Sequence, residues 1–171
     1  MAKIIWLTGL SGAGKTTLCK KIKKILNVKK KCLIIDGDTF RKKNKQFSFS
    51  KKNIISNNLR VIEYCKKNFI KYDYILVSVI SPLKKTRKYA SKIFKENYFE
   101  IHVFASLKIL VKRDTKGLYR LSKKGLINNL IGFNSKIKYE KSKHQYLRIN
   151  TGKLSLLQSA IKILKYAKVL N

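Results

Sequence analysis

Acidic residues are scarce in this chain, whose 171 residues include only eight Asp and Glu against 41 Lys and Arg, for a formal net charge of +33. The scarcity makes one pair conspicuous, because Asp36 and Asp38 flank a single glycine. Proline occurs once and glycine only eight times, so no flexible linker divides the chain. We therefore expect one domain over residues 1–171.

Long hydrophobic runs and paired cysteines are also absent. No apolar run approaches the roughly 20 residues that span a bilayer, so we expect no membrane partner. The start, residues 1–8, is too short for a signal peptide and runs straight into a glycine-rich loop. Cys19, Cys32 and Cys65 are far apart and odd in number, which excludes a metal-type or redox-type pair. Buried thiols in a reducing cytoplasm are expected.

Arginine is scarce as well, which bears on the meaning of the high charge. Only six of the 41 basic residues are arginines, and the lysines are spread along the whole chain. Proteins that read nucleic acids favour arginine, because its planar fork binds bases and phosphates bidentately. Solvated lysines, of the kind that AT-rich codons would give, explain much of the charge, with attraction of small anions as a second explanation. We expect no specific nucleic-acid partner.

The chain does contain an alternation of strand-like and helix-like segments. Four short apolar runs and a weaker fifth are typical of buried parallel strands, and they are residues 4–7, 33–35, 75–80, 101–104 and 147–149. Amphipathic stretches that predict helices are residues 15–26, 52–69, 83–94 and 154–166. This alternation predicts an α/β fold, a doubly wound parallel sheet that binds ligands at the carboxyl ends of its strands.

Residues 116–145 depart from this alternation. The segment is basic, contains three glycines and shows little periodicity. A connection of this length without regular structure is unusual and often functional. We interpret it as a mobile, basic lid with one short helix near residues 119–124.

The glycine-rich loop is the strongest functional signal. Residues 9–16 read Gly-Leu-Ser-Gly-Ala-Gly-Lys-Thr, between an expected strand and an expected helix. This is the P-loop pattern, in which backbone N–H groups hold phosphates, Lys15 reaches the outer phosphate oxygens and Thr16 offers its hydroxyl to Mg²⁺. The fold is therefore of the P-loop NTPase type, with ATP and Mg²⁺ as the expected cofactors.

Asp36 and Asp38 follow the second expected strand, and Arg41 lies one helical turn after Asp38. Carboxylates in this place hold the metal shell or accept a hydroxyl proton during phosphoryl transfer, while an arginine holds an anionic group. The plainer alternative is a helix-capping aspartate followed by a solvated arginine. Ser81-Pro82, taken alone, indicates only the end of a strand, because proline cannot donate to a ladder.

Four motifs together resemble adenylylsulfate kinases in order and in spacing: residues 9–17, 36–41, 80–82 and 113–119. The similarity runs from Ile4 to about Thr151, and the last motif, Arg-Asp-Thr-Lys-Gly-Leu-Tyr, is the most specific to the family. The resemblance implies a P-loop kinase, often a homodimer, that transfers phosphate from Mg-ATP to a ribose 3′-hydroxyl.

The resemblance also implies residue roles. Catalytic residues would be Lys15, Asp36 and Asp38, and the metal would be held by Thr16 and Asp36. ATP would be bound by Gly9, Ser11, Gly12, Ala13, Gly14, Lys15, Thr16, Thr17 and Arg113. The acceptor would be bound by Asp38, Arg41, Phe49, Asn57, Ile80, Ser81, Lys116 and Leu130. The family's serine at Ser81 is a possible phosphoserine, but direct in-line transfer needs no covalent intermediate, so we take it as a substrate contact.

Two departures from the family pattern fall on the acceptor side. Ile54 stands where the family has an arginine that grips the phosphosulfate, and Leu130 stands where a phenylalanine stacks on the adenine. An acceptor with a smaller base and an uncharged end would need neither contact. Cytidine 5′-diphosphoramidate, an intermediate in the decoration of bacterial capsules, is such a molecule, and we rank it slightly above adenylylsulfate unless Lys51, Lys52 or Phe133 compensates.

Two further functions are compatible with parts of the sequence. An Asp-x-x-Arg after a phosphate loop also suits polynucleotide 5′-kinases, although no aromatic platform or patterned arginine accompanies it here. A non-catalytic nucleotide-binding regulator is disfavoured, because Lys15, Thr16, Asp36 and Asp38 are all present.

Overall fold

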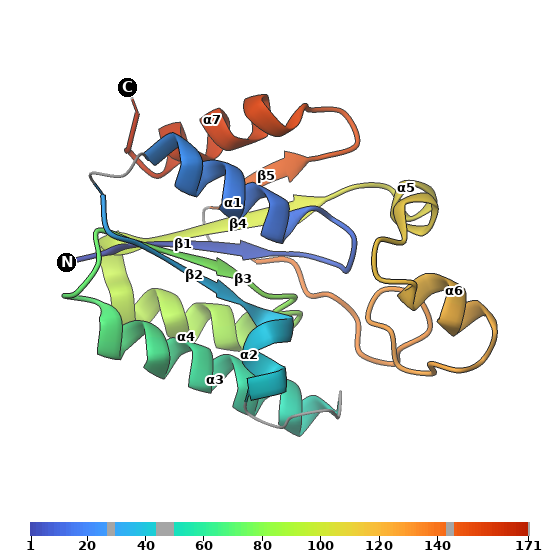
Figure 1. The fold of residues 1–171 in the computed structure, drawn as a ribbon. Coiled ribbons are helices and arrows are strands. Elements are labelled where there is room, and N and C mark those ends of the chain that lie inside the picture. The colour runs from blue at the N-terminus through green and yellow to red at the C-terminus, as the bar shows by residue number, and fades with distance from the viewer. Residues whose placement is uncertain (27–29, 44–49, 143–145, 171) are drawn as a thin grey trace.

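The computed structural model describes residues 1–171 except 27–29, 44–49, 143–145 and 171. Its centre is a five-stranded sheet in the order β2-β3-β1-β4-β5, in which every neighbouring pair is parallel (Figure 1). The strands are β1 (Lys3–Thr8), β2 (Cys32–Asp36), β3 (Tyr74–Ser78), β4 (Tyr98–Phe104) and β5 (Leu147–Asn150). The predicted doubly wound parallel sheet of the P-loop kinase type is confirmed.

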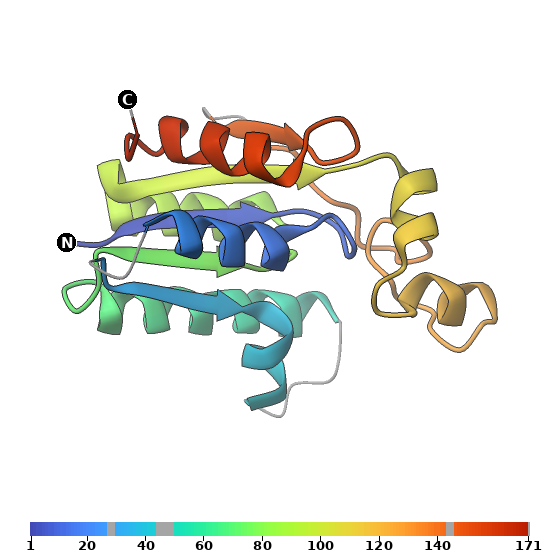
Figure 2. The same cartoon turned by 45° about the horizontal axis from the view of Figure 1, so that its top comes forward.

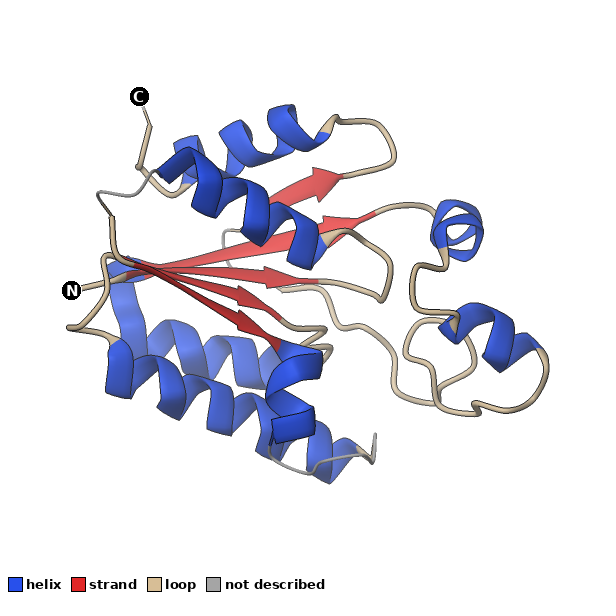
Figure 3. Ribbon diagram, viewed as in Figure 1, coloured by secondary structure: helices blue, strands red, loops and turns tan. Residues whose placement is uncertain are grey.

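Helices cover both faces of the sheet, so that the strands form a middle layer (Figure 3). They are α1 (Lys15–Leu26), α2 (Gly37–Lys43), α3 (Lys51–Asn68), α4 (Lys84–Phe94), α5 (Leu107–Arg113), α6 (Leu118–Lys123) and α7 (Leu156–Tyr166), with a 3₁₀ turn, η1 (Lys95–Asn97). The four predicted long helices are confirmed to within two residues, and the short helix predicted near residues 119–124 is α6. Helices α2 and α5 were not predicted.

The core has two layers because alternate residues of each strand point to opposite faces. In β1, Ile5 and Leu7 pack with α1 and α7, while Ile4 and Trp6 pack with α3 and α4. Helix α7 begins with a capping box in which Ser155 and Gln158 bond each other's backbone N–H groups. The predicted burial of the three cysteines is confirmed, and all three are free thiols. Within the described ranges, no helix is both long enough and apolar enough to cross a bilayer.

The carboxyl ends of the strands meet at one edge of the sheet, where the polar motifs converge as the sequence predicts. Helices α5 and α6 lie beyond this edge (Figure 2). Strand β3 ends at Ser78, two residues earlier than predicted, and the chain then turns through Ser81 with φ of 44°. Such a left-handed conformation is incompatible with a continuing strand.

After α6, the described chain up to residue 142 forms neither helix nor strand, yet it packs closely on the rest of the molecule. Leu130 and Ile131 are buried, and the Glu140 N–H donates to the Pro82 carbonyl at 2.8 Å. The Tyr119 hydroxyl of α6 donates to the Ser11 carbonyl at 3.0 Å. In the structure this segment therefore packs against the rest of the molecule, and its movement as a lid stays a prediction.

Candidate active site

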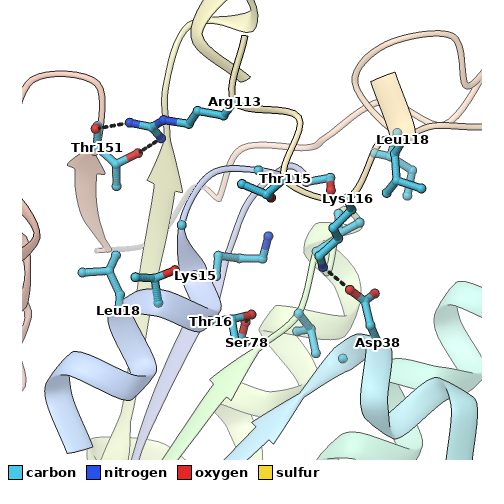
Figure 4. Close-up of a pocket in the computed structure, with 18 of the residues that line it drawn as sticks. Lys15, Thr16, Leu18, Asp38, Ser78, Arg113, Thr115, Lys116, Leu118 and Thr151 are labelled. Carbon is cyan, nitrogen blue, oxygen red and sulfur yellow. Dashed lines mark hydrogen bonds and ion pairs between the residues drawn. The ribbon is translucent and has the colours of Figure 1, made fainter. Parts of the chain in front are cut away.

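A cavity of about 510 Å³ opens at the carboxyl ends of β1, β2 and β3 (Figure 4). The phosphate loop forms one wall, the start of α2 a second, and residues from Arg113 to Ile131 close the top. Its lining includes Ser11, Gly12, Gly14, Lys15, Thr16, Thr17, Asp38, Arg41, Ser78, Ile80, Arg113, Lys116, Leu130, Ile131 and Thr151. Most of the residues that the sequence assigns to ATP therefore surround one space.

The phosphate loop connects β1 to α1 and passes very close to β4. Gly9 has φ of 140°, and a Cβ atom there would lie 2.0 Å from the Val103 carbonyl oxygen, so only glycine fits. The Lys15 ammonium is buried and donates to the Leu10 carbonyl at 2.8 Å. Burial, together with the nearby charge of Lys116, lowers the pKa of Lys15 to about 8. The loop is thus folded back on its own lysine, which lies beside the cavity.

Thr16, Asp36 and Ser78 join the ends of three elements. The Thr16 hydroxyl donates to Asp36 Oδ2 at 2.7 Å and lies 3.0 Å from the Ser78 hydroxyl. Asp36 does not line the cavity itself but reaches it through Thr16. Partial burial would raise the pKa of Asp36, but hydrogen bonds from Thr16 and two backbone N–H groups and the charge of Lys116 outweigh it, so the pKa lies below its ordinary value. Hard oxygen donors of this kind fit Mg²⁺.

Asp36 also caps α2, since its Oδ1 accepts the backbone N–H groups of Asp38 and Thr39, both at 3.1 Å. The capping alternative raised by the sequence is therefore real for Asp36. Its second half is wrong, because Arg41 is not solvated: the side chain is only 14% exposed, and its Nη2 lies 3.4 Å from Asp38 Oδ1.

Asp38 faces the cavity between two cations. Besides Arg41, the Lys116 ammonium forms an ion pair with Asp38 Oδ2 across the cavity (Figure 4). Lys116 lies between α5 and α6, in the segment that we predicted as a lid, so this ion pair connects that segment to α2. Each oxygen of the Asp38 carboxylate is therefore paired with one cation.

Arg113 lines the cavity from the end of α5 and is held by Thr151. Its two terminal nitrogens donate to the Thr151 hydroxyl at 2.9 Å and to the Thr151 carbonyl at 2.6 Å. The Thr151 hydroxyl donates in turn to the Ala13 carbonyl of the phosphate loop at 3.0 Å. Sequence reasoning missed Thr151, whose contact with the loop joins residues more than 100 positions apart and leaves no local pattern. It gave Tyr119 only as the last residue of a family motif, without a role.

The acceptor side contains a second, much smaller hollow of about 20 Å³, next to the main cavity. Arg41 and Ile80 border both spaces, whereas Ile54, Asn57, Asn58 and Ser81 border only the small one. Predicted residues Asn57 and Ser81 are thus close to Arg41 but outside the main cavity. Phe49 lies outside the described residues.

The walls of this hollow are apolar on one side and polar on the other. Ile54 is 4% exposed and packs in a cluster with Leu83 and Ile131. Asn58 donates through Nδ2 to the Ile54 carbonyl at 2.7 Å. The side-chain oxygens of Asn57, Asn58 and Ser81 are buried and have no partner among the described residues. Buried oxygens of this kind are costly unless a donor reaches them.

Leu130 lines the main cavity and is 7% exposed. Phe133, which the sequence offers as a substitute aromatic, packs edge-on against Tyr119 at 5.6 Å between ring centroids and does not line the cavity. Gly132 rests on the phosphate loop, since a Cβ atom there would lie 2.5 Å from the Leu10 side chain. Lys51 and Lys52 are exposed, and Lys52 borders a separate groove along α3.

Comparison with known proteins agrees with this geometry. A family model described as "Adenylylsulphate kinase" matches residues 1–150. A probable adenylyl-sulfate kinase of Pyrococcus abyssi is 37% identical over 169 residues, covering 97% of this chain and 95% of the relative. An adenylyl-sulfate kinase of Bacteroides thetaiotaomicron is 34% identical, covering 95% and 81%.

Solved structures give the same result. The APS kinase of Mycobacterium tuberculosis, solved in complex with AMPPNP and APS, has a TM-score of 0.88 and 28% identity over 98% of both chains. Shikimate kinase from Aquifex aeolicus, at 17% identity and a TM-score of 0.55, shares the fold. The match to the family model and the relatives that align along nearly the full length show that this chain belongs to the adenylylsulfate kinase family.

Proposed function

We propose that this kinase transfers the γ-phosphate of ATP to the ribose 3′-hydroxyl of a small nucleotide. The observation that carries the proposal is the single cavity that has Lys15 and Thr16 on one side and Asp38, Arg41 and Lys116 on the other. Phosphoryl transfer needs little covalent chemistry from the protein and much positioning and charge, which this arrangement supplies.

The donor would be held by the phosphate loop and Arg113. Lys15, close to the loop carbonyl it now bonds, would exchange that oxygen for phosphate oxygens. Thr16 and Asp36 would hold Mg²⁺, whose charge stabilises the transferring phosphoryl group. Two or more ligand positions would then come from phosphates and water, which is usual for this ion.

On the acceptor side, Asp38 would accept the hydroxyl proton or position the hydroxyl, while Arg41 and Lys116 would hold anionic groups of the acceptor. Asn57, Ile80 and Ser81 would contact the end of the acceptor that does not react. Transfer is direct and in line, so Ser81 stays unmodified during the reaction.

For the acceptor we propose cytidine 5′-diphosphoramidate, which places the enzyme in capsule phosphoramidate biosynthesis. Ile54 offers no charge to a terminal sulfate, and Leu130 offers no aromatic face to an adenine, which together remove contacts worth about 1.5–3 and about 1–3 kcal/mol. The three buried oxygens beside Ile54 call for hydrogen-bond donors. An amide end brings N–H donors, whereas a sulfate end has only acceptor oxygens.

Adenylylsulfate is the second candidate. It is favoured by relatives named adenylyl-sulfate kinases that align with nearly the whole chain at 31–37% identity. On this alternative the enzyme makes 3′-phosphoadenylylsulfate in sulfate assimilation, and Leu130 and Ile54 lower its affinity for the acceptor without changing the reaction.

A coupled ADP-release assay with each acceptor at equal concentration decides between the two. We expect turnover of the cytidine compound with a kcat/KM at least about tenfold above that of adenylylsulfate. Efficient turnover of adenylylsulfate with none of the cytidine compound overturns the cytidine proposal and leaves the kinase proposal standing. Filter binding of oligonucleotides across a salt series tests the polynucleotide alternative, for which steep salt dependence with measurable affinity at physiological salt is required.

Assembly and location complete the proposal. We propose a homodimer in the cytoplasm, on the resemblance to the family and on the three buried free thiols. Analytical ultracentrifugation at micromolar concentration measures the assembly directly.

A further inference from the structure

Arg87 lies in α4 with its side chain completely buried, which is rare for a guanidinium. Its Nε donates at 3.0 Å to Glu100 Oε1 in β4, and that side chain is only 1% exposed. Neither residue lines the cavity or the small hollow. Buried ion pairs often add little net stability, so the presence of this pair requires another explanation.

The remaining donors of Arg87 reach two segments that border the site. Nη1 donates to the Ser81 carbonyl at 2.5 Å. Nη2 donates to the Glu140 carbonyl and, at 3.1 Å, to the Ser142 hydroxyl. Residues 137–142, here called the return segment, are the last described part of the predicted lid and precede β5. One guanidinium therefore joins the turn that carries Ser81 to the return segment.

Tyr139 extends this connection to the phosphate loop. The Arg87 guanidinium carbon lies 5.1 Å from the centre of the Tyr139 ring, a cation–π distance. The Tyr139 hydroxyl is 3.1 Å from the Thr8 hydroxyl, which donates to the Ile80 carbonyl at 2.6 Å. Thr8 ends β1 and directly precedes the loop. The ends of the acceptor turn, the return segment and β1 thus share one polar network.

The acceptor turn depends on such support. Ser81 has φ of 44°, a conformation that a serine keeps only where its surroundings hold it. The group that Arg87 holds is the carbonyl of this same residue, which also accepts from the Thr8 hydroxyl at 3.3 Å, and Ser81 borders the acceptor hollow. Arg87 therefore restrains the backbone of a residue that borders the acceptor hollow.

We propose that Arg87 is a positioning residue for the acceptor, acting through Ser81 and the return segment without touching the substrate. It fixes the acceptor turn and the end of the lid region in one arrangement, so that Ser81 and Ile131 meet the acceptor together. The proposal rests on the proposed function only for the identity of the acceptor.

The test uses the full chain carrying Arg87→Lys, which keeps the charge and loses the fork, with Arg60→Lys on the exposed face of α3 as the matched control. We expect the KM for the acceptor to rise about tenfold, the size of one lost charge-assisted hydrogen bond, with the KM for ATP within about twofold. Amide hydrogen exchange of residues 137–142, measured with Mg-AMPPNP bound, should quicken about tenfold. Arg60→Lys should change none of the three.

An unchanged acceptor KM together with unchanged exchange overturns the proposal, and so does an equal rise of both KM values with a general loss of exchange protection. If Arg87→Lys does not fold, Ser142→Ala combined with Tyr139→Phe removes the hydrogen bonds of these two hydroxyls, while Arg87 keeps Glu100, Ser81 and the Glu140 carbonyl. That variant should quicken exchange in the return segment and raise only the acceptor KM. If the wild type phosphorylates neither acceptor, the proposed function fails, and hydrogen exchange alone decides the role of Arg87.

Discussion

The two sides of the cleft differ in how completely their polar groups are bonded. On the ATP side, Lys15, Thr16 and Arg113 each donate a hydrogen bond to a neighbour, at distances between 2.6 and 2.9 Å. On the acceptor side, the side-chain oxygens of Asn57 and Ser81 are buried and unpaired within the described chain. Where the polar groups already have partners, a ligand only replaces those partners, and the site is preorganised for it. Where buried oxygens lack partners, the ligand that adds most binding free energy is the one that brings hydrogen-bond donors to them.

This contrast explains where the chain departs from its family. A phosphate loop that must hold the same triphosphate tolerates little change, and its whole pattern is present in residues 9–16. The acceptor wall instead carries Ile54 and Leu130, apolar residues in places where the resemblance implies a cation and an aromatic ring. Under the proposed function, both departures lie on the side where the acceptor differs from adenylylsulfate.

We expect the largest effect from a substitution on the ATP side. Lys15→Ala removes the buried ammonium that would meet the phosphates, so we expect kcat to fall by at least about a thousandfold. A steady-state assay measures this, with thermal melting to show that the fold survives. Wild-type turnover in a folded Lys15→Ala variant would contradict the assignment of Lys15.

Asp38→Asn should distinguish ATP binding from catalysis. The substitution keeps the shape and removes the charge, so ATP affinity should stay within about threefold while kcat falls by about a hundredfold to a thousandfold. Isothermal titration with AMPPNP and a turnover assay on the same preparation give both values. Asp73→Asn, one residue before β3 and at the opposite end of that strand from the cleft, is the control and should alter neither. Unchanged turnover in Asp38→Asn rules Asp38 out as the base.

Restoring the family's residues at positions 54 and 130 tests which groups select the acceptor. Ile54→Arg together with Leu130→Phe should shift the ratio of kcat/KM for adenylylsulfate over the cytidine compound by about a hundredfold. Comparing both acceptors on the double variant and on each single variant shows which contact contributes more. A ratio that does not move in any of the three means that selectivity resides elsewhere.

The smallest effect concerns pH and ATP. Because the pKa of Lys15 is about 8 in the free protein and phosphates favour its charged form, ATP binding is fully supported below pH 8. Affinity should then fall as pH rises through 8, by up to about tenfold per pH unit, until the higher pKa of the bound form is reached. Equilibrium titration between pH 7 and 10 measures this, and Lys15→Met should give a flat profile over the same range.

The sequence predicts the sheet, the long helices and the phosphate loop because each leaves a local pattern of apolar spacing or glycines. The sequence does not predict helices α2 and α5, because each has seven residues, of which only one is buried, Gly37 in α2 and Leu110 in α5. The available signal for α5 was Ser106, whose hydroxyl accepts the Ile109 N–H and caps the helix. Short helices without an apolar stripe are invisible to periodicity.

The predicted site is more complete on the ATP side than on the acceptor side for the same physical reason. The loop residues are consecutive, so one motif places them all, whereas Ile54, Ser81 and Leu130 come from three distant elements. In our proposal the position of Ser81 depends on Arg87, which in the sequence is only one of six scattered arginines. A buried guanidinium that donates hydrogen bonds to distant backbone carbonyls leaves no pattern in the sequence.

Gly132 resting on Leu10 has a thermodynamic consequence. Leu10 belongs to the phosphate loop and Gly132 to the segment that borders the acceptor, so a shift of either backbone is transmitted through one leucine side chain. If bound ATP tightens the acceptor by some factor, the acceptor must tighten ATP by that same factor. Saturating one substrate in a titration of the other would therefore measure the total coupling between the two sides, and Leu10→Ala should lower it by the share that this contact carries.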